Sequence, residues 1–296
     1  MFTALSKNMY SSVMDFYIMN GAGNRFAIFD ARGTLDFQVS KEIVINFCAQ
    51  NSTEMGKKGA DQLIIIRDPK SKKSKVFMEI WNQKGFEVNA CGNATRCVAW
   101  IYMQEAGCSS MVLETKAGLL CCKLDSNNKV TVDMGKPELE WKKIPLAKEM
   151  NTESLKIKFD LDNYKIIGSP SAVNMGNPHC IFFIKDFSDI DYKKIGARIE
   201  IHSIFPEQAN IGFVKVINEN QIQLKVWERG VGMTLACGTG ACAAVVAAVR
   251  QKRVKNKVRV QVDGGELFID WEKNSQHVLM TGPVELEHKK VLKNYF

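Results

Sequence analysis

The sequence predicts an α+β fold built from two similar halves that face each other across a cleft. Its 296 residues are 46% hydrophobic and 24% charged, with 7 prolines and 21 glycines. This is the composition of a folded globular protein that is long enough for two domains. Runs with strand patterns alternate with a few helical runs, and two unlike landmarks recur at nearly the same offset, which indicates an internal duplication.

The first landmark is a tryptophan ten residues before a Cys-Gly pair that opens an apolar helix. Trp81 precedes Cys91 in this way and Trp227 precedes Cys237, so the offset is 146 residues. The second landmark is a turn rich in asparagine and glycine ahead of a strand. It occurs as MNGAGN at 19–24 and as NMGN at 174–177, where the offset from Asn24 to Asn177 is 153 residues.

In the first half, alternating β-branched and aromatic residues between turn signals predict seven strands. Ser40 is expected to cap a helix that runs to about Ala49. A longer helix should follow Cys91 and end near Glu105, because its apolar residues share one face before Gly107. The strands are Asp15–Met19, Arg25–Asp30, Leu63–Arg67, Val76–Trp81, Ser110–Lys116, Leu119–Leu124 and Lys129–Met134.

The second half is expected to repeat this plan. Its strand at Cys180–Ile184 follows the second turn landmark, and its helix is predicted at Ala241–Gln251. Gly135–Tyr164 has two prolines and little periodicity, so we take its start as a domain boundary. We therefore expect a first domain of residues 14–134 and a second of residues 135–278, with Val278–Gly282 beginning a return strand, 279–296, that rejoins the first domain.

Charge and cysteine content limit the partners and the compartment. Lys and Arg total 40 against 32 for Asp and Glu, a net charge of +8 that would suit an anionic small molecule or a nucleic acid. The basic run at 70–75 lacks interleaved aromatic residues and is expected to be a solvated loop, so we expect no nucleic-acid binding. Nine dispersed cysteines, an odd number, favour a reducing cytoplasm over a secreted disulfide framework.

No targeting, membrane or metal-binding segment is predicted. Met1–Val13 carries neither a secretory nor a transit pattern, and Met14 is a candidate native start. Gly230–Val249 has no charge, but its first half is rich in glycine and threonine. That composition predicts a loop followed by a buried helix, not a membrane span. No C-x-x-C motif occurs and only 4 histidines exist, so we expect no metal site.

The paired cysteines are the strongest indication of chemistry. Each is predicted at the first turn of a helix, where free N–H groups and the dipole favour a thiolate and can hold a carboxylate. Two thiols on opposite faces of one carbon suit an inversion: one thiolate removes the α-hydrogen and the other thiol returns a proton. A lone cysteine would more often be a buried apolar residue. We assign that core role to Cys97 and Cys242, and a structural role to Cys48, Cys108, Cys121 and Cys122.

Four blocks of the sequence resemble the signatures of diaminopimelate epimerases. They are 82–97 (NQKGFEVNACGNATRC), 175–179 (MGNPH), 210–214 (NIGFV) and 227–244 (WERGVGMTLACGTGACAA). The resemblance extends from about Met14 to Gly282. It implies two pseudo-symmetric α/β domains, each with a mixed sheet around a central helix and with the active site in the cleft between them.

The resemblance also implies a function. It is cofactor-independent interconversion of LL- and meso-2,6-diaminopimelate, in lysine and peptidoglycan-precursor synthesis, by a cytoplasmic enzyme that could be a homodimer. By this resemblance Cys91 and Cys237 are the acid/base pair, and His179 and Glu228 assist at the reacting carbon. The residues that would hold the α-carboxylate are Gly92, Asn93, Gly238 and Thr239, and those that would bind the rest of the substrate are Asn24, Asn82, Asn177, Asn210 and Arg229.

The sequence departs from the usual family pattern at Gln83-Lys84, Ala94, Gly212 and Met233, which bears on selectivity and loops but not on the reaction class. Simpler roles remain open for the polar residues: a surface ion pair for Glu228 and Arg229, a core position for His179, and turns for the asparagines. Three other functions also remain open. They are dinucleotide binding through 238–243 (GTGACA) with Asp263, a proline-racemase activity, in whose family a histidine usually stands where this chain has Asn93, and a non-enzymatic binding, metal or redox role.

Overall fold

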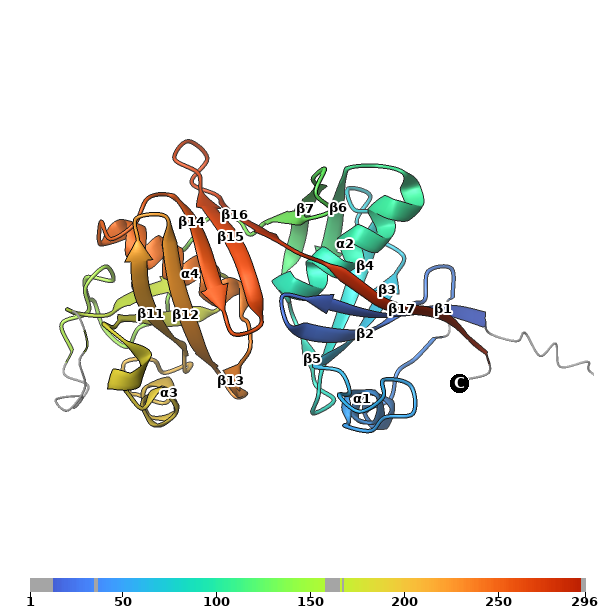
Figure 1. Cartoon of the computed structure of the whole chain (residues 1–296), viewed down its shortest axis with the longest axis horizontal. Helices are drawn as coiled ribbons and strands as arrows, with labels where there is room; N and C mark the ends of the chain where they lie inside the picture. Colours follow the sequence, from blue (N-terminus) through green and yellow to red (C-terminus); the bar gives the residue numbers. More distant parts are fainter. Residues whose placement is uncertain (1–12, 35–36, 158–165, 167, 294–296) are drawn as a thin grey trace, which may run out of the picture.

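The computed structural model describes residues 13–34, 37–157, 166 and 168–293. The predicted tail at 1–13, the boundary segment 135–164 and the return strand 279–296 each extend partly outside these ranges. Two lobes stand side by side, each with strands wrapped around one long helix (Figure 1). This is the predicted α+β architecture of two similar halves.

The first lobe holds a mixed sheet around helix α2. The sheet runs from β1 through β2, β3, β4, β6 and β7 to β8, with parallel pairs at β2–β3 and β4–β6 and antiparallel pairs elsewhere. The elements are β1 (Val13–Gly21), β2 (Asn24–Asp30), α1 (Lys41–Cys48), β3 (Gln62–Arg67), β4 (Val76–Asn82), β5 (Glu87–Val88), α2 (Gly92–Ala106), β6 (Ser110–Thr115), β7 (Gly118–Leu124) and β8 (Val130–Asp133).

The second lobe repeats the first strand for strand around helix α4. Its sheet runs from β9 through β10, β11, β12, β14 and β15 to β16, and the parallel pairs fall at the equivalent places, β10–β11 and β12–β14. The elements are β9 (Ser171–Asn174), β10 (Pro178–Phe183), η1 (Phe187–Asp189), α3 (Tyr192–Glu200), β11 (Asn210–Asn218), β12 (Gln221–Glu228), β13 (Gly232–Thr234), α4 (Gly238–Arg250), β14 (Lys257–Val262), β15 (Gly265–Trp271) and β16 (Val278–Gly282).

Local signals set most helix ends as predicted. Ser40 caps α1 by accepting a hydrogen bond from the Ile43 N–H at 3.2 Å. Gly107 ends α2 in the left-handed conformation, with φ 63°. The predicted start of the second helix at Ala241 was wrong, because α4 begins at Gly238. Glycines disfavour a helix by propensity, but here they lie where another side chain approaches the backbone closely.

The strands that follow α4 tie the lobes together. β16, which was expected to return to the first domain, pairs with β15 of the second lobe and also with β8 of the first. The strand that pairs with β1 is the next one, β17 (Glu285–Lys293). Within the described residues the strands therefore form one continuous sheet that passes from lobe to lobe through the β8–β16 pair.

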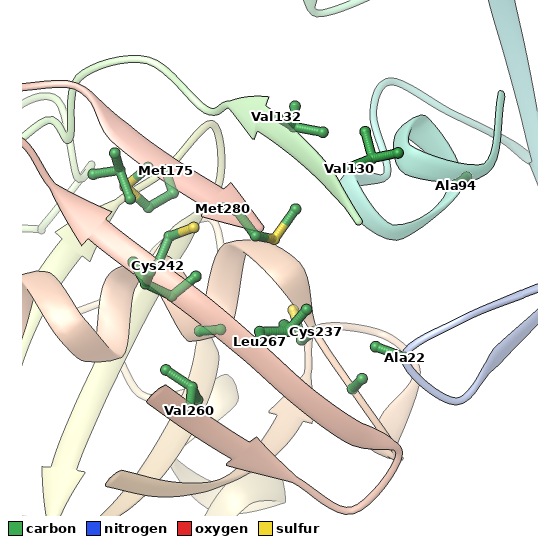
Figure 2. Close-up of a cluster of buried hydrophobic side chains, with 14 of the residues drawn as sticks. Ala22, Ala94, Val130, Val132, Met175, Cys237, Cys242, Val260, Leu267 and Met280 are labelled. Atoms are coloured by element: carbon green, nitrogen blue, oxygen red, sulfur yellow. The ribbon is translucent and has the colours of Figure 1, made fainter. Parts of the chain in front are cut away.

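A single apolar core spans the two lobes. It contains buried residues of both long helices, and α2 and α4 contact each other directly. Figure 2 shows side chains of the first lobe, such as Ala22 and Ala94, gathering with Cys237 and Met280 of the second. Two smaller cores lie outside it, one under α1 and one beside α3. The helix starts are thus held at the junction of the lobes.

Candidate active site

The two predicted catalytic cysteines occupy equivalent positions, each as the residue that precedes a helix. Cys91 before α2 has φ −150° and ψ 107°, and Cys237 before α4 has φ −131° and ψ 112°. Neither side chain makes a regular capping hydrogen bond to its helix. The N–H groups of Asn93 and Ala94 reach the Cys91 sulfur, and that of Gly240 reaches the Cys237 sulfur.

The starts of the two helices meet around the side chain of Met280 from β16. A Cβ atom on Gly92 would lie 2.7 Å from the Met280 methyl carbon, and one on Gly238 would lie 3.0 Å from its sulfur. A larger residue at either position would therefore have to displace the end of the Met280 side chain. Cys91 and Cys237 are close enough to interact electrostatically, and each also interacts with Glu228. The structure brings this predicted pair together.

Burial keeps both thiols protonated in this closed arrangement. It raises the pKa of Cys91 to about 11, although the two backbone N–H groups lower it. Burial, followed by the nearby Glu228 carboxylate, raises the pKa of Cys237 well above its ordinary range. A thiolate at either position therefore needs help from a positive charge or from hydrogen-bond donors.

Glu228 lies at the end of β12 beside one of the thiols. Its Oε1 accepts a hydrogen bond of 2.6 Å from the Thr234 hydroxyl, and its carboxyl group is also hydrogen-bonded to Cys237. Burial raises its pKa. The alternative of a surface ion pair between Glu228 and Arg229 is wrong for the geometry described, because Arg229 Nη1 donates instead to the Glu207 carbonyl at 2.8 Å.

Two equivalent polar contacts flank the cysteines. In the first lobe Asn93 Nδ2 donates to Asn24 Oδ1 at 2.6 Å. In the second lobe the counterparts of these residues, Thr239 and Asn177, are bridged by His179, whose Nε2 lies 3.1 Å from the Thr239 hydroxyl and 2.9 Å from Asn177 Oδ1. Thr239 also lies 3.5 Å from the Cys237 sulfur. Five of the predicted site residues thus form two matched arms.

His179 is fully buried, yet one of its ring nitrogens has no partner. Nδ1 makes no hydrogen bond. Burial, assisted by the charge of Arg229, lowers the pKa of His179 to about 3. The imidazole is therefore neutral at physiological pH, and it leaves one polar atom unpaired inside the site.

Two predicted substrate ligands bind parts of the protein itself. Asn82 Oδ1 accepts the N–H groups of Lys84 and Phe86 at 3.0 and 3.1 Å, which closes the turn after β4. Buried Asn210 donates to the Pro178 carbonyl at 3.0 Å and accepts the N–H of Arg229 at 3.0 Å. Asn82 and Asn210 hold loops in place in this structure, as the turn-forming alternative expected.

Sequence reasoning missed three contributors. Met280 separates the helix starts, and Lys84, regarded only as a departure from a pattern, donates through Nζ to the Gly230 carbonyl of the other lobe at 3.2 Å. Arg96 is completely buried on α2. A charged residue on the apolar face of a helix was the one available signal for Arg96, whereas the other two needed the packing of the lobes.

The other cysteines differ in exposure. Cys97 and Cys242 are fully buried, as their predicted core role requires. Cys48 and Cys122 are buried too, but Cys108 is half-buried and Cys121 is exposed. In the described ranges no helix is long and apolar enough to cross a bilayer, and no group of three His, Cys, Asp or Glu side chains is arranged to hold a metal ion.

Comparison with known proteins agrees with the geometry. Residues 16–140 and 171–287 match the family model described as diaminopimelate epimerase. The protein named diaminopimelate epimerase in Caulobacter vibrioides (strain NA1000 / CB15N) is 42% identical over 275 residues, which cover 92% of this chain and 95% of that one. The protein of the same name in Methylorubrum populi is 43% identical over 282 residues, which cover 92% of each.

Solved structures with the same fold are more distant in sequence. A phenazine biosynthesis protein of the PhzF family from Enterococcus faecalis has a TM-score of 0.67 at 14% identity and covers 95% of this chain and 99% of its own. A hydroxyproline epimerase from Agrobacterium vitis has a TM-score of 0.63 at 12% identity, with coverage of 96% and 94%. These likenesses show the two-lobed fold alone.

Proposed function

This chain belongs to the diaminopimelate epimerase family and is an isomerase, and from that premise we propose that it interconverts LL- and meso-2,6-diaminopimelate with two cysteines. The observation that carries the proposal is the position of Cys91 and Cys237 at equivalent starts of two abutting helices. A place in lysine and peptidoglycan-precursor synthesis, in the cytoplasm, is part of the same proposal.

The reaction needs one thiolate and one thiol. With the α-carbon between the sulfurs, the Cys91 thiolate takes the α-hydrogen as a proton and leaves the electron pair on carbon. The Cys237 thiol then gives its proton to the opposite face of that carbon and becomes the thiolate. The reverse reaction exchanges the two roles. One added proton balances one removed proton, and the configuration at carbon inverts.

The helix starts supply the stabilisation that this carbanion requires. Its negative charge spreads into the α-carboxylate, and the N–H groups of the helix starts, at Gly92, Asn93, Gly238 and Thr239, are suited to hold that carboxylate. Because two helix N-termini converge, their positive partial charges act together on a group bound between them. Neutral His179 and the Asn24–Asn93 contact would keep these turns in position.

The far end of the substrate carries a second carboxylate and a second ammonium group. Arg229 is exposed and its Nη1 donates to the carbonyl of Glu207. We propose that this guanidinium exchanges the carbonyl for the distal carboxylate, which it can bind through two parallel hydrogen bonds. Asn210 supports this role, since its side chain fixes the backbone of Arg229.

The test is to incubate reduced protein with LL-diaminopimelate in heavy water, without added pyridoxal phosphate. Deuterium should enter the meso product before it enters the remaining LL substrate, because the donor thiol exchanges with solvent while the abstracted proton stays on the other sulfur. Equal early labelling of substrate and product would indicate a single base. Conversion that depends on added pyridoxal phosphate would contradict the proposal.

Substitution of either cysteine supplies the second arm of this test. Cys91→Ser and Cys237→Ser should each lower kcat by at least about 100-fold, since each removes one proton-transfer group. Cys48→Ala is the matched control, because Cys48 is a buried helical cysteine in a separate core under α1. Turnover near the wild-type rate in either active-site variant would overturn the two-cysteine mechanism.

A further inference from the structure

Arg96 is a buried cation without an acidic partner. It lies on α2, and its side chain is fully shielded from solvent. Nη1 donates to Asn93 Oδ1 at 2.9 Å and lies 3.7 Å from the Met280 sulfur. Nε and Nη2 have no hydrogen-bond partner. Among the residues that the structure describes, the groups that interact with its charge are thiols.

The surrounding backbone seals the guanidinium in place. A Cβ atom on Gly282 would lie 2.9 Å from both Cζ and Nε of Arg96, so β16 passes over the guanidinium with a glycine. The three thiols that face it are those of Cys97, Cys91 and Cys242. Substrate therefore has no route to this cation, and any effect of Arg96 must act through its neighbours.

The duplication places this charge beside the other long helix. The offset of 146 residues makes Cys242 on α4 the counterpart of Arg96 on α2, and the two side chains are neighbours. One helix thus contributes a cation at the position where the other contributes a thiol. The two halves are alike in backbone and unlike in charge at this point.

A buried cation of this kind is costly for folding unless an anion forms beside it. The groups that interact with Cys91 are Arg96 and Cys97 on the helix that it precedes, Glu228 on β12, and Cys237, which precedes α4. Arg96 is the one positive side chain among them, and it opposes the effects of burial and of Glu228. Cys237 lies instead beside the Glu228 carboxyl group, which favours its protonated form.

We propose that Arg96 is the fixed counter-charge of the paired-cysteine site, a positioning residue that stabilises the thiolate form of Cys91 and, through Asn93, holds the turn that receives the substrate carboxylate. This inference rests on the proposed two-cysteine function. Of the two cysteines, it makes Cys91 the one that gives up its proton more readily, while Cys237 keeps its proton.

The test compares Arg96→Met, which removes the charge at similar length, with Arg96→Lys, which keeps it. Cys91 is half-buried, and its reaction with iodoacetamide is followed by peptide mapping at a fixed pH near 8. Loss of the charge should slow alkylation of Cys91 by at least about tenfold, since removing a nearby opposite charge raises a pKa by a unit or more. Arg96→Lys should restore much of the rate.

Thermal unfolding separates this role from a structural one. Because two of its nitrogens, Nε and Nη2, are unpaired, Arg96→Met should not lower the Tm, and kcat should fall. Arg250→Met is the matched control. Arg250 is a partly buried arginine in the last turn of α4 that donates to Ala172 O at 3.4 Å and Thr152 Oγ1 at 3.1 Å. Its replacement should lower the Tm and leave Cys91 alkylation unchanged.

Unchanged alkylation of Cys91 in folded Arg96→Met would overturn the proposal, and so would failure of both Arg96 variants to fold. The readout does not depend on the substrate assignment. If the Arg96 effect is found but the protein does not epimerise diaminopimelate, the proposed function fails and the counter-charge stands. If the protein epimerises diaminopimelate but the rate of Cys91 alkylation is the same in Arg96→Met as in the wild type, the proposed function stands and the counter-charge role fails.

Discussion

Acid should weaken this fold through His179. The buried imidazole cannot take up a proton until the pH approaches 3, whereas the unfolded chain takes it up near 6.5. The stability linked to this group is therefore complete above pH 6.5 and is lost as the pH falls towards 3. At about 1.4 kcal/mol per pH unit, the loss is about 2 kcal/mol by pH 5 and about 5 kcal/mol at its limit.

The assay is urea unfolding at pH 7.5 and pH 5 for the wild type and His179→Gln, whose amide is neutral at both pH values. The decrease in unfolding free energy between the two pH values should be about 2 kcal/mol larger for the wild type. His288→Gln, at an exposed position on β17, is the matched control and should behave as the wild type does. Equal decreases in the wild type and His179→Gln would refute the reasoning, because they would mean that the imidazole is protonated inside the fold.

Three further outcomes are expected. Gly92→Ala should lower the unfolding free energy by roughly 1–3 kcal/mol, measured by calorimetry, and should remove most of the turnover, because its Cβ would lie 2.7 Å from the Met280 methyl carbon. If that contact is the cause, adding Met280→Ala should restore part of the lost stability. Storage in air should inactivate the protein reversibly through a Cys91–Cys237 disulfide, found by peptide mapping and prevented by substrate, whereas inactivation with both thiols free would place the oxidation elsewhere. Arg229→Lys should raise KM for diaminopimelate because lysine cannot form the two parallel hydrogen bonds, and a wild-type KM would exclude Arg229 as the distal ligand.

Much of the fold could be predicted because the duplication repeats each local signal. Apolar periodicity and the Gly107 stop gave α2 its observed extent. The start of α4 was misplaced because glycine disfavours a helix by local propensity. Gly238 instead reflects the close packing of Met280, which lies 42 positions further along the sequence. Helix α3 was not predicted, although Asp191 caps it by accepting the Lys194 N–H at 3.0 Å, because only four of its nine residues are buried.

Part of the candidate site could likewise be predicted from local sequence patterns, and part depends on packing between distant segments. Spacing alone was enough to pair Cys91 with Cys237, since both follow the same local motif. Spacing could not show that the side chains of Asn82 and Asn210 hydrogen-bond to backbone groups, because those partners depend on turn geometry and on a neighbouring strand. Nor could it show that Arg96 is unpaired, since that depends on every element packed around it.

The β8–β16 pair has a mechanical consequence. Within the described residues the chain leaves the first lobe through β8 and returns through β16, and these strands are hydrogen-bonded to each other from Leu279 opposite Asp133 to Gly282 opposite Val130. A two-stranded ribbon flexes across its face but resists sliding and twisting, which would break its hydrogen bonds. Sliding of one lobe past the other would therefore break the β8–β16 hydrogen bonds. Met280 lies on this ribbon between the two helix starts, so the same pairing that joins the lobes also fixes the side chain that separates the two cysteine-bearing turns.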